Sequence, residues 1–128
     1  MADSPFPGYI EAAKIGALRV RMDPQGFVEI DQACQELIDQ LTGARADARE
    51  LGEQTQWGLG EDNPRLSSAA ELVRLFREKG FGGPNNAYDT LKEYLAVAEE
   101  IRAMFKAISD AYQRTDSEFA AKMRELRV

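Results

Sequence analysis

The sequence predicts an all-α protein, and three observations support this fold class. Two long segments carry apolar residues at alternating steps of three and four, which is the spacing of one helical face. The Asn-Gly and Asp-Gly pairs typical of β-hairpins are absent. The chain has 128 residues, which suits one domain with a single hydrophobic core. We therefore expect an antiparallel hairpin of two long helices with a short helix in the connection.

The first long helix is expected over about residues 25–56. Asp23 offers a capping side chain and Pro24 suits a first helical turn. Gly26 weakens that turn, so a start near Phe27 is the alternative. Such a helix would be roughly 45 Å long at 1.5 Å per residue, and it needs an equally long partner. Its apolar stripe consists of Ile30, Cys34, Leu37, Leu41, Ala44, Ala48 and Leu51.

The second long helix is expected after the break at residues 82–84. Asn85 or Asn86 would cap it, and Asp89 would place a negative charge in its first turn, where the helix dipole favours one. The helix is expected to reach Phe119, and a continuation through Met123 and Leu126 is left open. The step from Leu95 to Ile101 is three plus three, which indicates either a locally altered supercoil or a wider apolar face there. The stripe consists of Leu91, Leu95, Ala98, Ile101, Phe105, Ile108, Tyr112, Thr115 and Phe119.

The connection between the long helices contains a short helix, expected over about residues 68–80. Ser68 and Glu71 match the capping box, in which each side chain satisfies a free backbone N–H group. Gly80 indicates the end of this helix. Its apolar face consists of Leu72, Leu75 and Phe76.

Residues 1–23 are expected to form an N-terminal extension, ahead of a hairpin domain at 24–128. Tyr9 to Leu18 is compatible with a short helix, whereas Ala17 to Met22 alternates weakly like a strand, and the sequence leaves both open. Prolines and charges interrupt residues 1–25, so we expect no cleaved secretory signal.

The composition favours an interaction protein over an enzyme. Its 22 acidic and 16 basic residues give a net charge of -6, which repels phosphate backbones and anionic lipids, so neither nucleic acid nor a membrane is an expected partner. No histidine is present, which removes the commonest general base and nitrogen ligand. We expect no catalytic residue, no metal site and no cofactor.

Cys34 is the only cysteine, so the chain forms no intramolecular disulfide and no zinc site of the cysteine type. We interpret Cys34 as a small hydrophobic residue on a helix, with a reactive or dimer-linking thiol as the alternative if it is exposed.

Two short elements stand out as candidate recognition sites. Trp57, Gly58 and Gly60 lie where the first long helix is expected to end, and a large aromatic side chain there could cap either the core or a partner. Tyr112 and Asp116 are four residues apart, so a helix would present the phenol and the carboxylate on one face.

These elements, together with two long amphipathic helices and an acidic chain, resemble the WXG-type small proteins of type VII (ESX) secretion, as a divergent member. The resemblance covers roughly residues 24–60 and 84–120. It implies helical hairpins that pair as homodimers or heterodimers into four-helix bundles and are exported folded. It also implies that Tyr112 and Asp116 form a secretion signal read by the secretion ATPase. In the family, this signal lies near the tryptophan-glycine turn of the partner subunit.

The resemblance therefore implies a protein that is cytoplasmic when made and secreted or cell-surface afterwards. A single hairpin leaves one flank of each apolar stripe in water, so we expect dimerisation. The expected partner interface consists of Ile38, Tyr94, Val97 and Met104. The alternative is a cytosolic helical adaptor or regulator, in which Tyr112 and Asp116 are ordinary helix residues.

Overall fold

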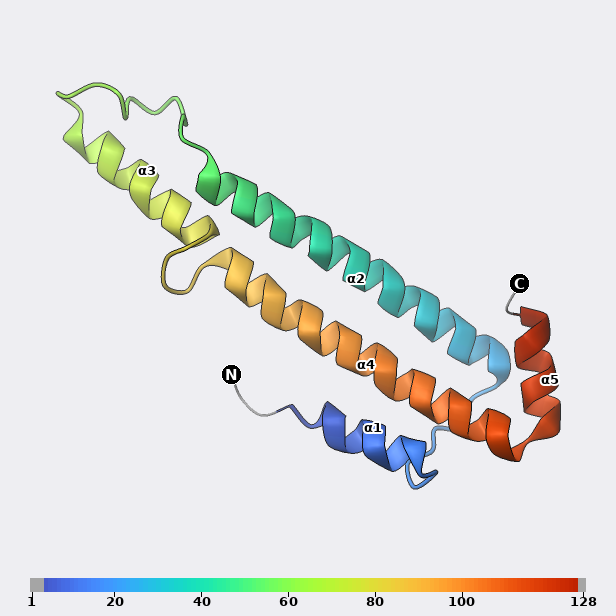
Figure 1. The fold of residues 1–128 in the computed structure, drawn as a ribbon. Helices are drawn as coiled ribbons and strands as arrows, with labels where there is room; N and C mark the ends of the chain where they lie inside the picture. The colour runs from blue at the N-terminus through green and yellow to red at the C-terminus, as the bar shows by residue number, and fades with distance from the viewer. Residues whose placement is uncertain (1–3, 127–128) are drawn as a thin grey trace. The chain divides into compact units, whose positions relative to one another are not determined.

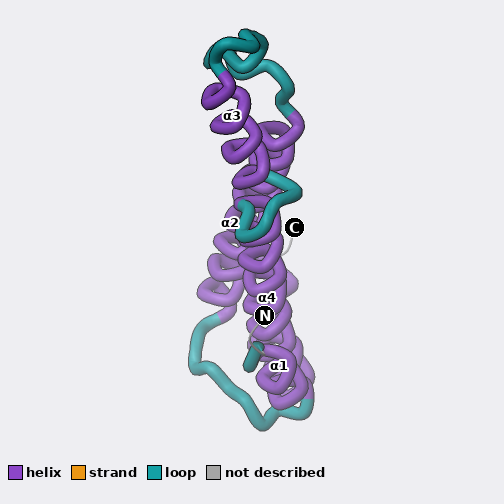
Figure 2. The backbone as a smooth tube through the Cα atoms, turned by 90° about the vertical axis from the view of Figure 1, so that its left-hand side faces the viewer, coloured by secondary structure: helices purple, strands orange, loops and turns teal. Residues whose placement is uncertain are grey.

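The computed structural model describes residues 4–126, and every regular element within them is an α-helix (Figures 1 and 2). The all-α prediction is therefore confirmed for this part of the chain. The helices are α1 (Phe6–Lys14), α2 (Pro24–Glu53), α3 (Ser67–Gly80), α4 (Ala87–Thr115) and α5 (Ser117–Leu126).

The described residues form two compact units. Unit 1 comprises residues 4–39 and 96–126, and unit 2 comprises residues 40–95. Unit 1 contains α1, the first part of α2, most of α4 and α5, whereas unit 2 contains the rest of α2, α3 and the start of α4. Residues 4–23, expected as an extension, belong to unit 1.

The start of α2 follows the predicted capping. The Asp23 carboxylate accepts a hydrogen bond from the Gly26 N–H group at 2.8 Å, which satisfies one free donor of the first turn. The alternative start near Phe27 is wrong, because the helix begins at Pro24. It ends at Glu53, three residues before the expected end.

The start of α4 also follows its predicted cap. Asn86 is only 2% exposed, and its side-chain oxygen accepts a hydrogen bond from the Asp89 N–H group at 2.8 Å. Its amide nitrogen donates to the Gly83 carbonyl at 2.6 Å and to the Asp89 carboxylate at 2.9 Å. Of the two candidate asparagines, Asn86 is therefore the cap.

The continuation of the second long helix through Leu126 is wrong. Helix α4 ends at Thr115 and α5 begins at Ser117. Thr, Asp and Ser follow one another at residues 115–117, and their short polar side chains offer the backbone local hydrogen bonds that compete with a continuous helix. The Asp116 carboxylate makes such a bond, because it caps α5.

The predicted capping box of α3 is also wrong. Because α3 begins at Ser67, Ser68 lies inside the first turn, and Leu66 occupies the cap position without a side-chain hydrogen bond. Glu71 instead pairs with Arg74. The predicted end at Gly80 is confirmed.

The N-terminal segment forms a helix, α1, that starts at Phe6 and ends at Lys14. Residues 17–23 have no regular structure, so the strand interpretation is wrong. Ala13 of α1 is fully buried and belongs to the core of unit 1. Leu18 and Val20 pack against the same core, so this segment contributes apolar surface to the unit.

Helices α1, α2, α4 and α5 share the core of unit 1. Asp31 of α2 pairs with Arg102 of α4 at 2.8 Å, and Phe27 contacts Tyr112 with ring centroids 6.0 Å apart. Residue numbers fall along α2 as they rise along α4, so these segments run in opposite directions within the unit (Figure 1). The buried cluster consists of Ala13, Phe27, Ala107, Ile108, Phe119 and Met123.

Unit 2 relies on small residues where the end of α2 meets the end of α3. A Cβ atom added at Gly80 would lie 2.8 Å from the Ala48 carbonyl oxygen, and one added at Gly52 would lie 2.5 Å from the Phe81 Cβ atom. Both glycines are buried. The two helices approach this closely because neither glycine has a side chain.

Candidate functional site

The junction between α4 and α5 holds the predicted signal residues. The Asp116 N–H group donates to the Tyr112 carbonyl at 2.8 Å, which closes the last turn of α4. The Asp116 carboxylate accepts a hydrogen bond from the Phe119 N–H group at 3.0 Å, which caps α5. Asp116 therefore lies between α4 and α5 and not on one helical face with Tyr112, because α4 ends at Thr115, and a backbone hydrogen bond joins the two residues.

The Tyr112 ring is half-buried in an aromatic cluster of unit 1. It stacks on Phe119 with centroids 5.2 Å apart and planes at 24°, and it also contacts Phe27. The Arg19 guanidinium carbon lies 5.9 Å from the centre of the Tyr112 ring, which suits a cation–π interaction. Tyr112 is therefore part of the packing of the unit as well as a partly accessible group.

Asp116 is exposed, and within the described residues it takes part in no ion pair. A carboxylate has about four lone-pair positions, and the bond from Phe119 uses one of them. The remaining positions are available to a second molecule. The junction between α4 and α5 therefore presents one accessible negative charge, four residues after Tyr112.

The predicted turn element lies in unit 2 and has a hydrogen-bond system of its own. The Glu61 carboxylate accepts hydrogen bonds from three consecutive N–H groups, those of Trp57, Gly58 and Leu59, at 2.5, 2.9 and 2.8 Å. These bonds, the one from Trp57 foremost, lower the pKa of Glu61 to about 2. Such a concave run of N–H groups is a typical binding arrangement for an anion, and Glu61 fills it.

Both turn glycines have the left-handed backbone that favours glycine, with φ of 72° at Gly58 and 92° at Gly60. The Trp57 ring lies 5.8 Å from the Phe76 ring of α3, and its indole N–H group donates to the Gln54 carbonyl at 2.9 Å. Trp57 is half-buried, so it covers part of α3 and leaves part of its ring in water. Sequence reasoning missed Glu61, although its place four residues after Trp57 could have suggested a local contact.

The expected partner interface is only partly open. Tyr94 is 58% exposed, whereas Ile38, Val97 and Met104 are half-buried. Met104 also packs against the core of unit 1, so part of its apolar surface is already covered within the chain. Tyr94 therefore offers the most accessible surface of the four.

The apolar face of α3 is largely exposed. Leu72, Leu75 and Phe76 are 42–43% exposed, and Val73 is the apolar residue of α3 that is buried. These three residues follow helical spacing, so they form one stripe, here called the α3 stripe. The sequence identified the stripe but not its direction. In the structure, the buried residues of α3 are Val73 and Gly80, which lie outside the stripe.

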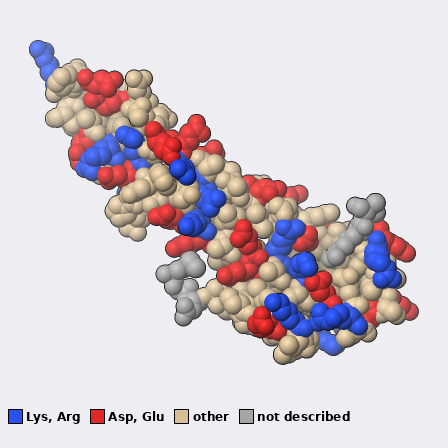
Figure 3. Space-filling view, in the orientation of Figure 1, with Lys and Arg blue, Asp and Glu red and all other residues tan. Residues whose placement is uncertain are grey.

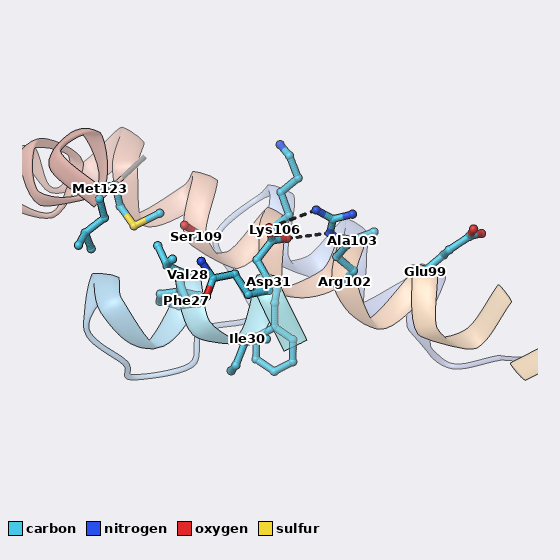
Figure 4. Close-up of a pocket in the computed structure, with 13 residues that line it drawn as sticks. Phe27, Val28, Ile30, Asp31, Glu99, Arg102, Ala103, Lys106, Ser109 and Met123 are labelled. Carbon is cyan, nitrogen blue, oxygen red and sulfur yellow. Dashed lines mark hydrogen bonds and ion pairs between the residues drawn. The ribbon is translucent and has the colours of Figure 1, made fainter. Parts of the chain in front are cut away.

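Unit 1 also contains an open groove of about 800 Å³, lined by residues of α2, α4 and α5 (Figure 4). The Asp31 and Arg102 side chains pair on its wall, and Glu99 extends away from that pair. Hydrogen bonding to Asp31 raises the pKa of Arg102 and keeps it charged. The apolar lining includes Phe27, Val28, Ile30, Ala103, Phe105, Met123 and Leu126.

Cys34 is a half-buried free thiol, and burial raises its pKa above the usual value. A raised pKa disfavours the reactive thiolate, in keeping with a packing role. Within residues 4–126, no three acidic or thiol side chains are placed together to hold a metal ion. Across the same residues, no helix combines the length and the apolar character needed to cross a bilayer.

Comparison with known proteins adds no relative from which a role could be transferred. No family model, no curated protein and no solved structure matches the chain. The two candidate sites are therefore described by their geometry alone. They are the exposed Asp116 carboxylate that caps α5 in unit 1 and the tryptophan turn closed by Glu61 in unit 2.

Proposed function

We propose that this chain acts through protein contacts in type VII (ESX) secretion, either exported folded or escorting a partner. It carries out no chemistry in this role. The secretion ATPase reads Tyr112 and Asp116, and the chain is made in the cytoplasm and ends up secreted or on the cell surface.

The observation that carries the proposal is the exposed Asp116 carboxylate, four residues after Tyr112. A signal read by another protein must be available before that protein arrives, and Asp116 takes part in no ion pair with the described residues. Its negative charge costs little in water and adds little to stability. A reader that supplies a cation would therefore bind it at low cost.

Dimerisation is the second part of the proposal. The α3 stripe and Tyr94 expose large apolar side chains, and such surfaces commonly mark protein contacts. We infer that two copies, or one copy and a related hairpin, cover them in a four-helix bundle. The opposed directions of α2 and α4 in unit 1 support the hairpin on which this assembly depends.

The turn at Trp57, Gly58 and Gly60 would serve as a fixed contact point for the partner. Three hydrogen bonds to Glu61 hold its backbone, and Phe76 supports the indole ring from one side. A rigid, partly exposed aromatic group binds with little loss of conformational entropy.

A cytosolic helical adaptor is the second candidate function, and one observation favours it. The capping bond from Asp116 and the packing of Tyr112 account for both residues as structural elements. In that case both residues would be needed for folding alone, and export would not occur.

The two functions differ in where the protein is found. The full-length chain with a small C-terminal tag is expressed in the native bacterium, and the culture medium and cell surface are compared with the cytoplasm. The proposal expects tagged protein outside the cell while a cytosolic marker remains inside. Retention of all tagged protein with the marker would support the adaptor.

A further inference from the structure

A small basic pocket lies beside Tyr112 in unit 1. It has a volume of about 350 Å³ and is formed by the end of α1, the loop after it and the end of α4. Lys14, Arg19 and Arg114 line it, and none of its lining residues is acidic. Figure 3 shows Lys and Arg side chains gathered over the ends of α1 and α4. A cluster of this kind is notable in a chain with a net charge of -6.

Helix dipoles account for only part of this charge. Lys14 and Arg114 lie in the last turns of α1 and α4, where each helix end carries roughly half a negative charge. Glu11 pairs with Lys14 at 3.3 Å and offsets about one more positive charge. When the two helix ends and Glu11 are set against the three cations, a surplus of about one positive charge remains. That surplus suits a single carboxylate better than a polyanion.

The two guanidinium groups are held in place while most of their donors stay open. Arg114 donates one hydrogen bond to the Lys14 carbonyl at 2.6 Å, and a guanidinium has five N–H donors. The Arg19 guanidinium carbon lies 5.9 Å from the centre of the Tyr112 ring, and within residues 4–126 Arg19 takes part in no ion pair. Both groups therefore keep donors suited to the two oxygens of a carboxylate.

The rest of the pocket is apolar. Ile108 and Ala111 are buried behind it, at 1% and 8% exposed, and Ile15 on its rim is 80% exposed. A free anion would leave Ile15 uncovered. A peptide that places an acidic side chain next to an apolar one would satisfy both parts of the surface.

We propose that this pocket binds a carboxylate-bearing peptide segment of a partner protein. The acidic side chain lies between Arg19 and Arg114, and a neighbouring apolar side chain covers Ile15. The proposal gives the chemistry of a partner for the Tyr112 region and so rests on the proposed function. Its test measures binding in solution, so its failure can be told apart from a failure of export.

The test uses the full-length ¹⁵N-labelled protein at low salt. Acetyl-Leu-Glu-Leu-amide, its Leu-Gln-Leu counterpart and inorganic phosphate are added in separate titrations at matched ionic strength. The proposal expects saturable NMR shifts at Gly16, Arg19 and Ala111 with the glutamate peptide alone. Absence of shifts there, or equal shifts with the glutamine peptide, would overturn it. An equal response to phosphate would show that the pocket binds small anions in general, and it would also overturn the proposal.

Two substitutions locate the binding. Arg19→Gln removes one charged donor and is expected to lower the affinity for the glutamate peptide about tenfold. Arg124→Gln removes an exposed cation of α5 outside the pocket and should leave the affinity unchanged. Equal weakening by both substitutions would show a general charge effect and contradict the proposal. The spectrum of each variant without peptide shows whether it is folded.

Discussion

At the junction between α4 and α5, one side chain connects stability with the proposed signal. The Asp116 carboxylate caps α5, so replacing it with alanine removes a structural bond together with the charge. Asparagine caps a helix about as well as aspartate, and it carries no charge. Comparing the two substitutions therefore separates the capping role from any role of the charge.

Asp116→Ala is expected to lower the free energy of unfolding by about 1 kcal/mol, because the Phe119 N–H group loses its partner. Asp116→Asn should stay within about 0.5 kcal/mol of the wild type. Urea unfolding followed by circular dichroism measures both values. Equal losses for the two variants would mean that the cap bond does not stabilise α5.

The stability of the turn at Trp57 depends on pH through the Glu61 carboxylate. A pKa lowered in the folded state to about 2 stabilises the turn fully above the ordinary value of 4.5, and this contribution is lost as pH falls toward 2. We expect the Glu61 carboxyl carbon to titrate near pH 2 by NMR, and Trp57 fluorescence to change over the same range. Glu61→Gln should remove that fluorescence change. Titration of Glu61 near 4.5 would contradict the three hydrogen bonds.

Among the elements, the helix starts could be predicted from the sequence, whereas a helix break and the direction of an apolar face could not. The Asp23 cap and the Asn86 cap of α4 were predictable, because each bond joins residues three apart in sequence. The helix break at Asp116 could not be predicted from the apolar spacing, because Phe119 and Met123 continue that spacing beyond it. The outward direction of the α3 stripe depends on contacts between distant segments, which periodicity does not encode.

Two glycines of α2 give a matched test of these contacts. At Gly52 an added Cβ atom would lie 2.5 Å from the Phe81 Cβ atom and 2.9 Å from the Phe81 backbone nitrogen. Gly52→Ala should therefore destabilise the protein by about 1–3 kcal/mol. Gly43 has no atom within 4 Å of such a Cβ atom, so Gly43→Ala should stabilise it by about 0.5–1 kcal/mol. Thermal melting of both variants checks the opposite signs.

For the whole molecule, the central question is what covers the exposed apolar side chains. We expect light scattering at micromolar concentration to give twice the chain mass of 14.3 kDa, or a complex with a related hairpin from the native source. Leu75→Glu should return the protein to the monomer mass, because a charge in an apolar interface lacks a partner.

Ala70→Glu is the control for this substitution. Ala70 is also exposed on α3, and the helical repeat of about 100° per residue places it opposite the α3 stripe. The Ala70→Glu variant should therefore keep the dimer mass. A monomer at micromolar concentration with no partner co-purified from the native source would contradict the dimer.

Export of two charge variants of the full-length chain tests the central claim most directly. Asp116→Asn removes the proposed signal charge and keeps a capping side chain, whereas Asp110→Asn removes a nearby charge whose ion pair with Lys106 is exposed. We predict that the Asp110→Asn variant is found outside the cell, as the wild type is, and that the Asp116→Asn variant stays inside at normal cellular abundance. Normal export of the Asp116→Asn variant would contradict it.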